Sequence, residues 1–254
     1  HPILELIRAR VAAGTRPSRH GDGARLGLAV EGGGMRGCVS AGMVTALHRL
    51  GAADAFDAVY GSSAGCLVGA YFISRQTNGT AVYHDVLPEA GARFLDKSRL
   101  VAALGATTSM RPRAWAGLRP RLPHDVFNLD FLMTTVVGRL WPLDWTSFWA
   151  NNRHQPLNVV VSGLLSMDSH TLTSAKGHFA TLPELARCMR ASMLVPGMTG
   201  PLVTFPGHQP FADALIFEPM PYRSAAADGC THVVVLRTRP DGSQVGAFAR
   251  SCYE

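Results

Sequence analysis

The chain has 254 residues, 47% of them hydrophobic, and a formal net charge of +6. A chain of this length can bury a large core within one α/β domain, and its apolar content excludes an intrinsically disordered protein. The apolar runs, such as residues 66–73, are far shorter than the roughly 20 residues of a transmembrane helix, so we expect no membrane span.

Arginine supplies nearly all of the positive charge, because Lys97 and Lys176 are the only lysines among 24 basic residues. This charge either favours attraction to a phosphate-bearing surface such as anionic lipid or belongs to an ordinary solvated surface. Most arginines are scattered along the chain. One cluster surrounds Trp115 and consists of Arg111, Arg113, Arg119 and Arg121.

The five cysteines are odd in number and lack CxxC spacing, which argues against a disulfide framework and against a zinc site. We therefore expect a reducing, intracellular compartment, with peripheral membrane association left open. The chain begins with His1 instead of methionine, which is compatible with a removed targeting segment and leaves the organelle open.

Apolar residues recur at helical spacing from Ile3 to Val11, and Gly14 ends the pattern. Residues 15–25 are rich in Gly, Arg and Ser, which is typical of a linker. The sequence thus predicts an N-terminal helix and linker over residues 1–25 and one main domain over residues 26–254.

Two strand, turn and helix units follow in succession. Residues 26–30 are predicted as a strand that leads through a glycine-rich turn into a helix at about 39–50. Residues 58–60 are predicted as a second strand, which ends in another small-residue turn before a helix at 67–75. This order predicts an α/β fold with a mainly parallel sheet and helices on its faces.

The rest of the chain divides into an irregular helical part and further sheet elements. Proline-rich breaks interrupt the helical pattern of residues 80–152, which we interpret as a lid-like insertion. A short strand at 211–212 leads into Asp213. The other expected elements are strands at 157–165, 170–174 and 232–236 and a helix at 183–191.

The second turn, Gly61-Ser62-Ser63-Ala64-Gly65, has the Gly-x-Ser-x-Gly spacing of a nucleophile elbow. Such a turn projects its central serine above the sheet and requires small residues where the backbone bends sharply. We predict Ser63 as the nucleophile, with Gly61 and Gly65 shaping the elbow, and a purely structural turn is the alternative. Ser62 lies off the centre of the motif and is not expected to react.

The first turn also has a spacing, Gly-x-Gly-x-x-Gly, that fits a dinucleotide site. Such a site requires an acidic residue after the second strand to bind the ribose, whereas Asp54 and Asp57 precede that strand. Beside Ser63, the unobstructed amides of this loop would instead stabilise an oxyanion, and a tight structural turn is the third possibility. Arg36 would brace the loop or attract a phosphate. The predicted oxyanion loop comprises Gly32, Gly33, Gly34, Arg36 and Gly37.

A serine hydroxyl needs a positioned base to become a good nucleophile. No histidine follows the last predicted strand, where a Ser-acid-His triad would place it. Asp213 follows a strand among apolar residues, and desolvation there would raise the pKa of its carboxyl above the usual value of about 3.9. The sequence favours a Ser63/Asp213 dyad. The histidines left as candidates by position alone are His170, His178 and His208.

These motifs together resemble the patatin-like phospholipase family over residues 26–240. In order they are the glycine loop, the elbow at Ser63, the stretch Ala191-Ser192-Met193-Leu194-Val195-Pro196, and Asp213. The resemblance implies a three-layer α/β/α sandwich, a Ser63/Asp213 dyad, an oxyanion hole from the first glycine loop, and membrane or micellar lipid esters as substrates. It also implies no cofactor and no metal. We expect no nucleic-acid or nucleotide partner, and the oligomeric state is left open.

One position departs from the family's pattern, because Ala214 stands where glycine usually follows the aspartate. If that position required a positive φ, alanine would cost about 1 to 2 kcal/mol and would shift Asp213. This departure leaves a second hypothesis, in which a catalytically weak or inactive fold of this type serves as a lipid-binding or structural subunit of an assembly.

Trp141, Trp145 and Trp149 recur every four residues, and Pro142 is placed for the first turn of a helix. An aromatic stripe at this spacing is most often core packing. The alternative is an acyl-chain or membrane-docking surface, because tryptophan suits an interface that is apolar on one side and wet on the other.

Overall fold

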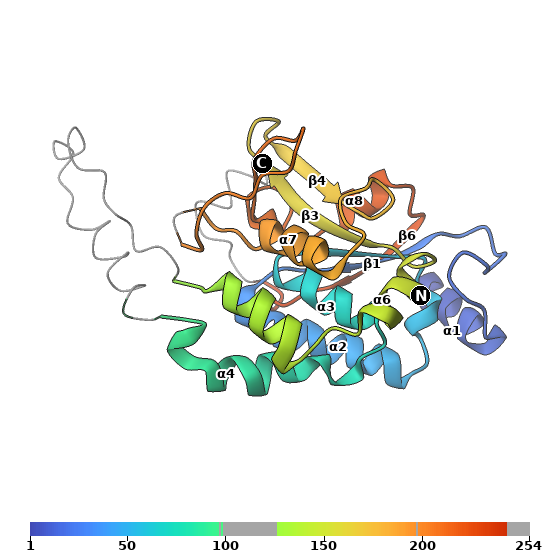
Figure 1. The fold of residues 1–254 in the computed structure, drawn as a ribbon. Coiled ribbons are helices and arrows are strands. Elements are labelled where there is room, and N and C mark those ends of the chain that lie inside the picture. Colours follow the sequence, from blue (N-terminus) through green and yellow to red (C-terminus); the bar gives the residue numbers. More distant parts are fainter. Residues whose placement is uncertain (97, 99–125, 197, 243–254) are drawn as a thin grey trace.

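The computed structural model describes residues 1–96, 98, 126–196 and 198–242, and within them six strands form one central sheet (Figure 1). Four neighbouring strands follow the order β3-β2-β1-β6 and are parallel. The other two, β4 and β5, pair with β3 in the antiparallel sense. The strands are β1 (Leu26–Val30), β2 (Ala58–Ser62), β3 (Leu157–Gly163), β4 (Asp168–Leu172), β5 (Phe211–Ala212) and β6 (His232–Leu236).

The parallel strands are apolar along nearly their whole length because both faces of the sheet are covered where they lie. Every residue of β1, β2 and β3 is buried. Since these strands are parallel, their carboxyl ends lie at one edge of the sheet, where the loops after β1 and β2 meet. The expected mainly parallel sheet is therefore confirmed.

Helices cover the two faces of the sheet unequally (Figure 1). The main core lies on one face, where Leu28 of β1 and Val59 of β2 join side chains of three helices, α2, α3 and α7. On the other face, Ala58 and Tyr60 pack against Ala225 of the short helix α8. The resulting layers are those of an α/β/α fold. These helices span Gly37–Arg49 (α2), Ala64–Ile73 (α3), Leu182–Ser192 (α7) and Tyr222–Ala227 (α8).

Helix α3 lies at the centre of the core, and each of its ten residues is buried. A helix that is apolar on all sides needs neighbours on all sides, and α3 packs between the sheet, α2 and α6 (Trp145–Asn152). It begins three residues before the predicted position of 67, directly after Ser63. The elbow and the helix are thus one continuous feature.

The N-terminal helix α1 (Pro2–Ala13) is tied to the amino edge of the sheet through Arg10, which is 2% exposed. Its guanidinium donates to Asp22 at 2.7 Å, to Asp57 at 2.8 Å and to the carbonyl oxygen of Ala55 at 2.7 Å. These bonds hold the segment predicted as a linker against the main domain. The division of the chain at residue 25 stays a prediction.

The described part of the predicted insertion consists of short helical turns that join the main core. Tyr83, Leu87, Leu132 and Val136 all belong to the core cluster on the α3 face. The elements are η2 (Ala53–Ala55) before this region, then η3 (Thr77–Thr80), η4 (Val82–Val86), α4 (Leu87–Ala90), η5 (Gly91–Arg93) and η7 (Phe131–Leu140).

The tryptophan stripe packs on the core. Trp145 stacks on Trp149 with ring centroids 5.2 Å apart, and both are partly buried against the core cluster, as is Trp141. The prediction that Pro142 lies in the first helical turn is wrong, because the Asp144 side chain caps the helix and the helix begins at Trp145. The arginine cluster around Trp115 and Cys252 lie outside the described residues.

Candidate active site

Ser63 lies between β2 and α3 in a strained backbone conformation, with φ 50° and ψ −123°. A positive φ is uncommon for a residue with a side chain, and such strain concentrates at functional sites. The turn brings the backbone of Gly65 against β1, where an added Cβ would lie 2.2 Å from the carbonyl oxygen of Val30. Only glycine permits this approach, which explains the spacing of the elbow.

Asp213 lies within hydrogen-bond distance of Ser63, whose Oγ donates to Asp213 Oδ2 at 2.9 Å. Asp213 follows β5, and its own amide donates to the carbonyl oxygen of Leu194 at 2.7 Å. The other carboxylate oxygen accepts the amide of Leu215 at 2.7 Å. These contacts fix the carboxylate from both sides.

The Asp213 side chain is 4% exposed. Burial raises the pKa of its carboxyl to about 6, although the hydrogen bonds from the Leu215 amide and from Ser63 oppose this rise. The group is therefore a stronger base than a solvated aspartate while it stays largely ionised at pH 7.

Ala214 leaves this geometry undisturbed. It is the first residue of the short helix η8 (Ala214–Ile216), and it is not among the residues with a positive φ. Ala214 therefore does not carry the backbone strain that a positive φ would cause. Ala214 is fully buried, so its methyl group adds to the packing around Asp213.

Ser192, at the end of α7, connects the elbow to β3. Its Oγ accepts the amide of Ser63 at 2.8 Å and donates to the carbonyl oxygen of Val160 at 2.5 Å. This serine was recognised from the sequence only as part of a motif, without a role. Its position in a buried chain of hydrogen bonds makes it a positioning residue for the strained turn.

The glycine loop after β1 includes the short helix η1 (Gly34–Arg36) and lies beside Ser63. Three of its amides are already used inside the protein. Gly32 donates to the carbonyl oxygen of Pro219 at 3.0 Å, Arg36 donates to that of Gly33 at 3.1 Å, and Gly37 donates to that of Gly34. The prediction that Gly32, Arg36 and Gly37 belong to the oxyanion loop is therefore corrected, because their amides are occupied. Within the described chain, the amides of Gly33 and Gly34 have no internal acceptor, and both residues line the cavity at Ser63.

Gly37 serves packing. A Cβ at this position would lie 2.5 Å from the ring of Tyr83, whose hydroxyl donates to the carbonyl oxygen of Ala64 at 3.1 Å. The absence of a side chain lets the ring reach the first turn of α3 and form one wall of the site.

A buried carboxylate outside the glycine motif itself holds the base of the glycine loop. Glu31 is 2% exposed and accepts hydrogen bonds from the amide and the hydroxyl of Thr238. The same hydroxyl lies 3.0 Å from the carbonyl oxygen of Gly32. The only signal in the sequence is the place of Glu31 between an apolar strand and the glycines, where a buried charge needs several donors.

The candidate histidine bases lie elsewhere. His170 contacts Ser166 at 2.7 Å and Gln209 at 3.0 Å, and His178 contacts Thr173. His208 packs near His178, with ring centroids 5.1 Å apart. Among the histidines in the described ranges, none is hydrogen-bonded to Ser63 or Asp213.

The acidic residues considered for a ribose are also engaged elsewhere. Asp54 pairs with Arg75, and Asp57 pairs with Arg10 at 2.8 Å. Asp57 also accepts the amide of Leu26 at the start of β1, which is the edge of the sheet opposite Ser63. No group of three or more potential metal ligands occurs in the part of the chain that the structure describes.

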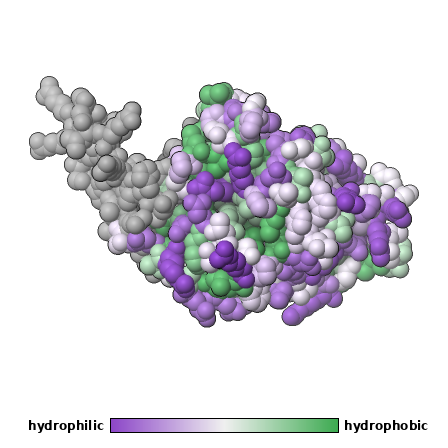
Figure 2. All heavy atoms as spheres, in the orientation of Figure 1, coloured by the Kyte–Doolittle hydropathy of each residue, from purple (hydrophilic) through white to green (hydrophobic). Residues whose placement is uncertain are grey.

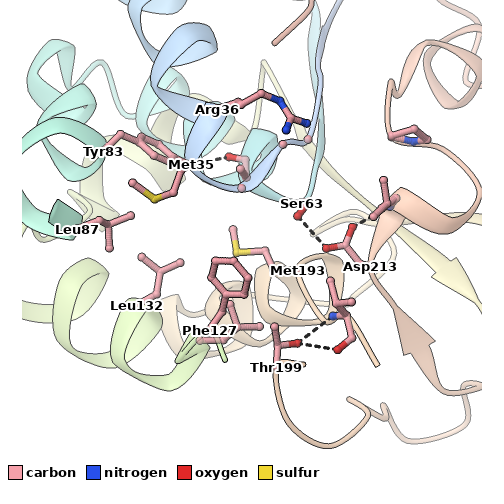
Figure 3. Close-up of a pocket in the computed structure, with 18 of the residues that line it drawn as sticks. Met35, Arg36, Ser63, Tyr83, Leu87, Phe127, Leu132, Met193, Thr199 and Asp213 are labelled. Carbon is pink, nitrogen blue, oxygen red and sulfur yellow. Dashed lines mark hydrogen bonds between the residues drawn. The ribbon is translucent and has the colours of Figure 1, made fainter. Parts of the chain in front are cut away.

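An apolar cavity of about 280 Å³ opens beside Ser63 and Asp213 (Figure 3). Figure 3 shows Ser63 and Asp213 facing each other, with Met35, Leu87 and Leu132 around the adjoining space. The predicted insertion forms part of the wall and supplies Tyr83, Leu87, Phe94, Phe127, Leu129 and Leu132. The three tryptophans of residues 141–149 do not line it.

Two arginines, Arg36 and Arg239, also line this cavity. Arg36 is exposed and Arg239 is partly exposed, and neither side chain has an ion-pair partner among the described residues. Arg239 was not predicted as a site residue. It follows the last strand of the sheet, so only the neighbourhood of β1 and β6 brings it to the glycine loop.

No helix in the described ranges is both long and apolar enough to cross a bilayer. Comparison with solved structures finds similarity to VipD from Legionella pneumophila, at 15% identity and a TM-score of 0.40, over 75% of this chain and 45% of that one. Human GIVD cytosolic phospholipase A2, in complex with methyl gamma-linolenyl fluorophosphonate, is similar at 14% identity and a TM-score of 0.37, over 85% of this chain and 30% of that one. The chain thus spans less than half the length of either protein. Comparison with curated proteins gives no significant match.

The model of one protein family, described as patatin-like phospholipase, matches residues 28–226. The matched stretch contains the glycine loop, Ser63, Ser192 and Asp213. It is well over half of the chain, and the mainly parallel sheet between helices agrees with the fold expected from the resemblance. This chain therefore belongs to the patatin-like phospholipase family.

Proposed function

We propose that this protein is a serine acyl hydrolase that cleaves fatty-acyl esters of glycerolipids, with Ser63 as nucleophile and Asp213 as base. The observation that carries the proposal is the 2.9 Å contact between Ser63 Oγ and Asp213 Oδ2 beside an apolar cavity. A strained elbow, a carboxylate of raised pKa and an apolar chamber are the parts that such a reaction requires.

In the proposed reaction, Ser63 Oγ forms a bond to the ester carbonyl carbon while its proton passes to Asp213. The tetrahedral intermediate then expels the alcohol, which takes the proton from Asp213, and leaves an acyl-enzyme. Water attacks this acyl group, gives its proton to Asp213, and releases the fatty acid as Ser63 regains the proton. One carboxylate thus acts as base and acid in both halves of the cycle.

The amides of Gly33 and Gly34 are the proposed donors to the oxyanion. They lack internal acceptors in the described chain and lie in the wall of the cavity next to Ser63. The N-terminus of α3 directly follows Ser63, and its partial positive charge favours the same developing negative charge. Loss of one oxyanion donor typically costs about 3 to 4 kcal/mol of barrier.

The proposed substrate places one acyl chain in the cavity and its polar head at Arg36 and Arg239. The volume of about 280 Å³ is near the lower end of ligand pockets, roughly 300 to 1,000 Å³, and so favours one acyl chain. Two arginines without ion-pair partners among the described residues favour a phosphate-bearing head group, since a guanidinium matches phosphate geometry. A phospholipase A activity is the specific form of the proposal.

A fluorophosphonate probe tests the nucleophile, because it reacts covalently with activated serines. We expect the folded protein to be labelled, the Ser63→Ala variant to lose labelling, and the Ser62→Ala variant to keep it. Ser62 is the matched control because its hydroxyl is buried and donates to the carbonyl oxygen of Glu218. Absence of labelling in the folded wild type would contradict the proposal.

The same variants assayed on a lipid panel identify the substrate class. We expect hydrolysis of diacyl phospholipids that disappears in Ser63→Ala. The hypothesis of an inactive subunit anticipated a Ser63 hydroxyl out of reach of Asp213, and the 2.9 Å contact removes that support. It would return if wild type and Ser63→Ala were equally inactive on every lipid.

A further inference from the structure

The turn between β3 and β4 exposes two large apolar side chains where turns usually carry polar residues. Leu165 is 77% exposed and Met167 is 68% exposed. Met167 also has a φ of 54°, a conformation in which asparagine, aspartate or glycine is expected. Residues 164–167, which include this pair, form the hairpin tip.

Hydrogen bonds hold the hairpin tip in place. The side-chain oxygen of Gln209 accepts the amides of Leu165 at 2.7 Å and Ser166 at 2.8 Å. The amide of Met167 donates to the carbonyl oxygen of Gly163 at 3.0 Å. Because these amides are fixed, the two apolar side chains are held outward instead of folding onto the sheet.

The hairpin tip projects from the same edge of the sheet as Ser63. Ser62 of β2 lies opposite Val160 of β3, and β3 continues three residues further to Gly163. At roughly 3.3 Å per residue, the turn begins about 10 Å beyond the level of Ser62. The tip therefore stands past the nucleophile at the carboxyl edge of the strands.

Other exposed apolar side chains gather at this edge. Leu215, which is 43% exposed, follows Asp213 and lines the cavity. Leu202, which is 44% exposed, precedes Val203, and Val203 pairs with Phe211 beside the end of β3. Figure 2 shows hydrophobic atoms at the top of the molecule, over the position of the β3–β4 turn. Exposed apolar side chains thus lie at the cavity, next to the end of β3 and on the hairpin tip.

We propose that the hairpin tip is a membrane anchor that inserts Leu165 and Met167 into a lipid surface and brings the cavity to its substrate. A stable protein interface buries about 1,200 Å² or more, far beyond what two side chains on a narrow turn supply. A lipid surface accepts single apolar side chains without shape complementarity. This docking role rests on the proposed lipid hydrolase function for its purpose, but it is measurable without catalysis.

Vesicle binding tests the anchor. The double variant Leu165→Gln, Met167→Asn removes both apolar side chains, and asparagine tolerates the positive φ of Met167. We expect its affinity for neutral phosphatidylcholine vesicles to be at least about tenfold lower than that of the wild type, since burial of each side chain is worth that factor or more. Sedimentation with vesicles measures the change.

Leu50 provides a matched control. It is 71% exposed and follows α2, in the connection that leads to the amino end of β2. Leu50→Gln therefore removes a similar apolar surface at the opposite edge and should leave vesicle binding unchanged. An equal loss in this variant, or no loss in the double variant, would overturn the anchor.

Thermal unfolding shows whether the double variant folds. If it does not fold, a variant that adds a fluorescence signal still tests the anchor. In Leu165→Trp, the tryptophan fluorescence should shift to shorter wavelength on addition of vesicles, whereas Leu50→Trp should show no added shift. Absence of the shift in Leu165→Trp would overturn the anchor even if the double variant is unfolded.

Hydrolysis of a water-soluble short-chain ester separates this proposal from the proposed function. A double variant that keeps this activity but loses vesicle binding supports both. The wild type could also bind vesicles through the tip and yet neither hydrolyse esters nor react with the fluorophosphonate. That result supports the anchor and contradicts the hydrolase. If the enzyme is active and the double variant binds vesicles as tightly as the wild type, only the anchor is contradicted.

Discussion

Asp213 is held between two opposing effects on its pKa. Burial raises the pKa to about 6, while the hydrogen bonds that it accepts favour the ionised form. The proposed reaction needs the ionised carboxylate, so kcat/KM for a soluble ester should rise about tenfold per pH unit below 6 and level off above it. Initial rates between pH 4.5 and 8 measure this profile. A midpoint near 4, as for a solvated aspartate, would contradict the raised pKa of Asp213.

Ser192 is expected to matter through the backbone that it holds. Ser192→Ala leaves the buried amide of Ser63 and the carbonyl oxygen of Val160 without their partner, which should lower the free energy of unfolding by about 1 to 3 kcal/mol. It should also lower kcat more than it changes KM, because the elbow shifts. Chemical denaturation and steady-state kinetics measure the two effects.

Ser162 is the matched control for this change. It is equally buried in β3, but its hydroxyl has no hydrogen-bond partner among the described residues. Ser162→Ala should therefore leave stability unchanged or improve it, with kcat unaffected. Equal losses in both variants would mean that the connection from Ser192 to Ser63 is not the cause.

At the scale of elements, the elbow depends on how closely α3 approaches β1. A methyl group at Gly65 would lie 2.2 Å from the backbone oxygen of Val30, which cannot move without displacing the strand. Gly65→Ala should therefore cost at least about 3 kcal/mol of unfolding free energy or prevent folding. Gly42 lies in the middle of α2 with open space around it, so Gly42→Ala should add about 0.5 to 1 kcal/mol. Thermal unfolding compares the two.

The helical turns of residues 82–140 line one part of the apolar cavity. These elements should therefore influence which acyl-chain length the protein prefers. Leu132 of η7 lines the cavity, and Leu132→Trp should fill part of it. The ratio of kcat/KM for a dodecanoyl ester to that for a butanoyl ester should fall about tenfold or more. Leu140→Trp, at the exposed end of the same helix, is the control and should keep the ratio. An unchanged ratio in Leu132→Trp would place the acyl chain elsewhere.

At the scale of the whole molecule, Asp213 couples the proposed site to stability. Its pKa is about 6 in the fold and about 3.9 in an unfolded chain, so between these values the native state binds more protons. The contribution of this group is therefore fully present below pH 4 and is lost as the pH rises through 6. From pH 4 to pH 7, wild type should lose about 2 to 3 kcal/mol relative to Asp213→Asn. Urea denaturation of both proteins across this range measures the difference, and parallel pH profiles would contradict the coupling.

Much of the fold was predictable because its signals are local. The strand at 26–30, the strand before Ser63 and the final strand at 232–236 were predicted from short apolar runs between turns, and the structure confirms them. Boundaries shifted where a turn merges into a helix, as at Gly37 and Ala64. The family was also predictable, since its motifs occur in order along the chain and the family match confirms them.

The sequence was enough to name the residues of the proposed chemistry, but it did not show what surrounds them. Ser63 and Asp213 were selected from motifs, and their nearness was an expectation until the fold brought together residues 150 positions apart. Gly32 and Gly37 belong to the same glycine run as Gly33 and Gly34, yet their amides are used by Pro219 and by the preceding turn. No sequence pattern distinguishes a free amide from an occupied one.

What the sequence by itself determined is the order of strands, turns and helices, the elbow, and membership in the family, because each depends on residues that are near neighbours in the chain. The tertiary structure alone decided that Ala214 carries no strain, that Arg239 reaches the cavity, and that the insertion lines part of it. It also decided that Leu165 and Met167 project from the edge that carries Ser63. The physical reason is that burial, pKa and hydrogen-bond occupancy depend on which distant segments pack together, and the order of strands in the sheet sets that packing.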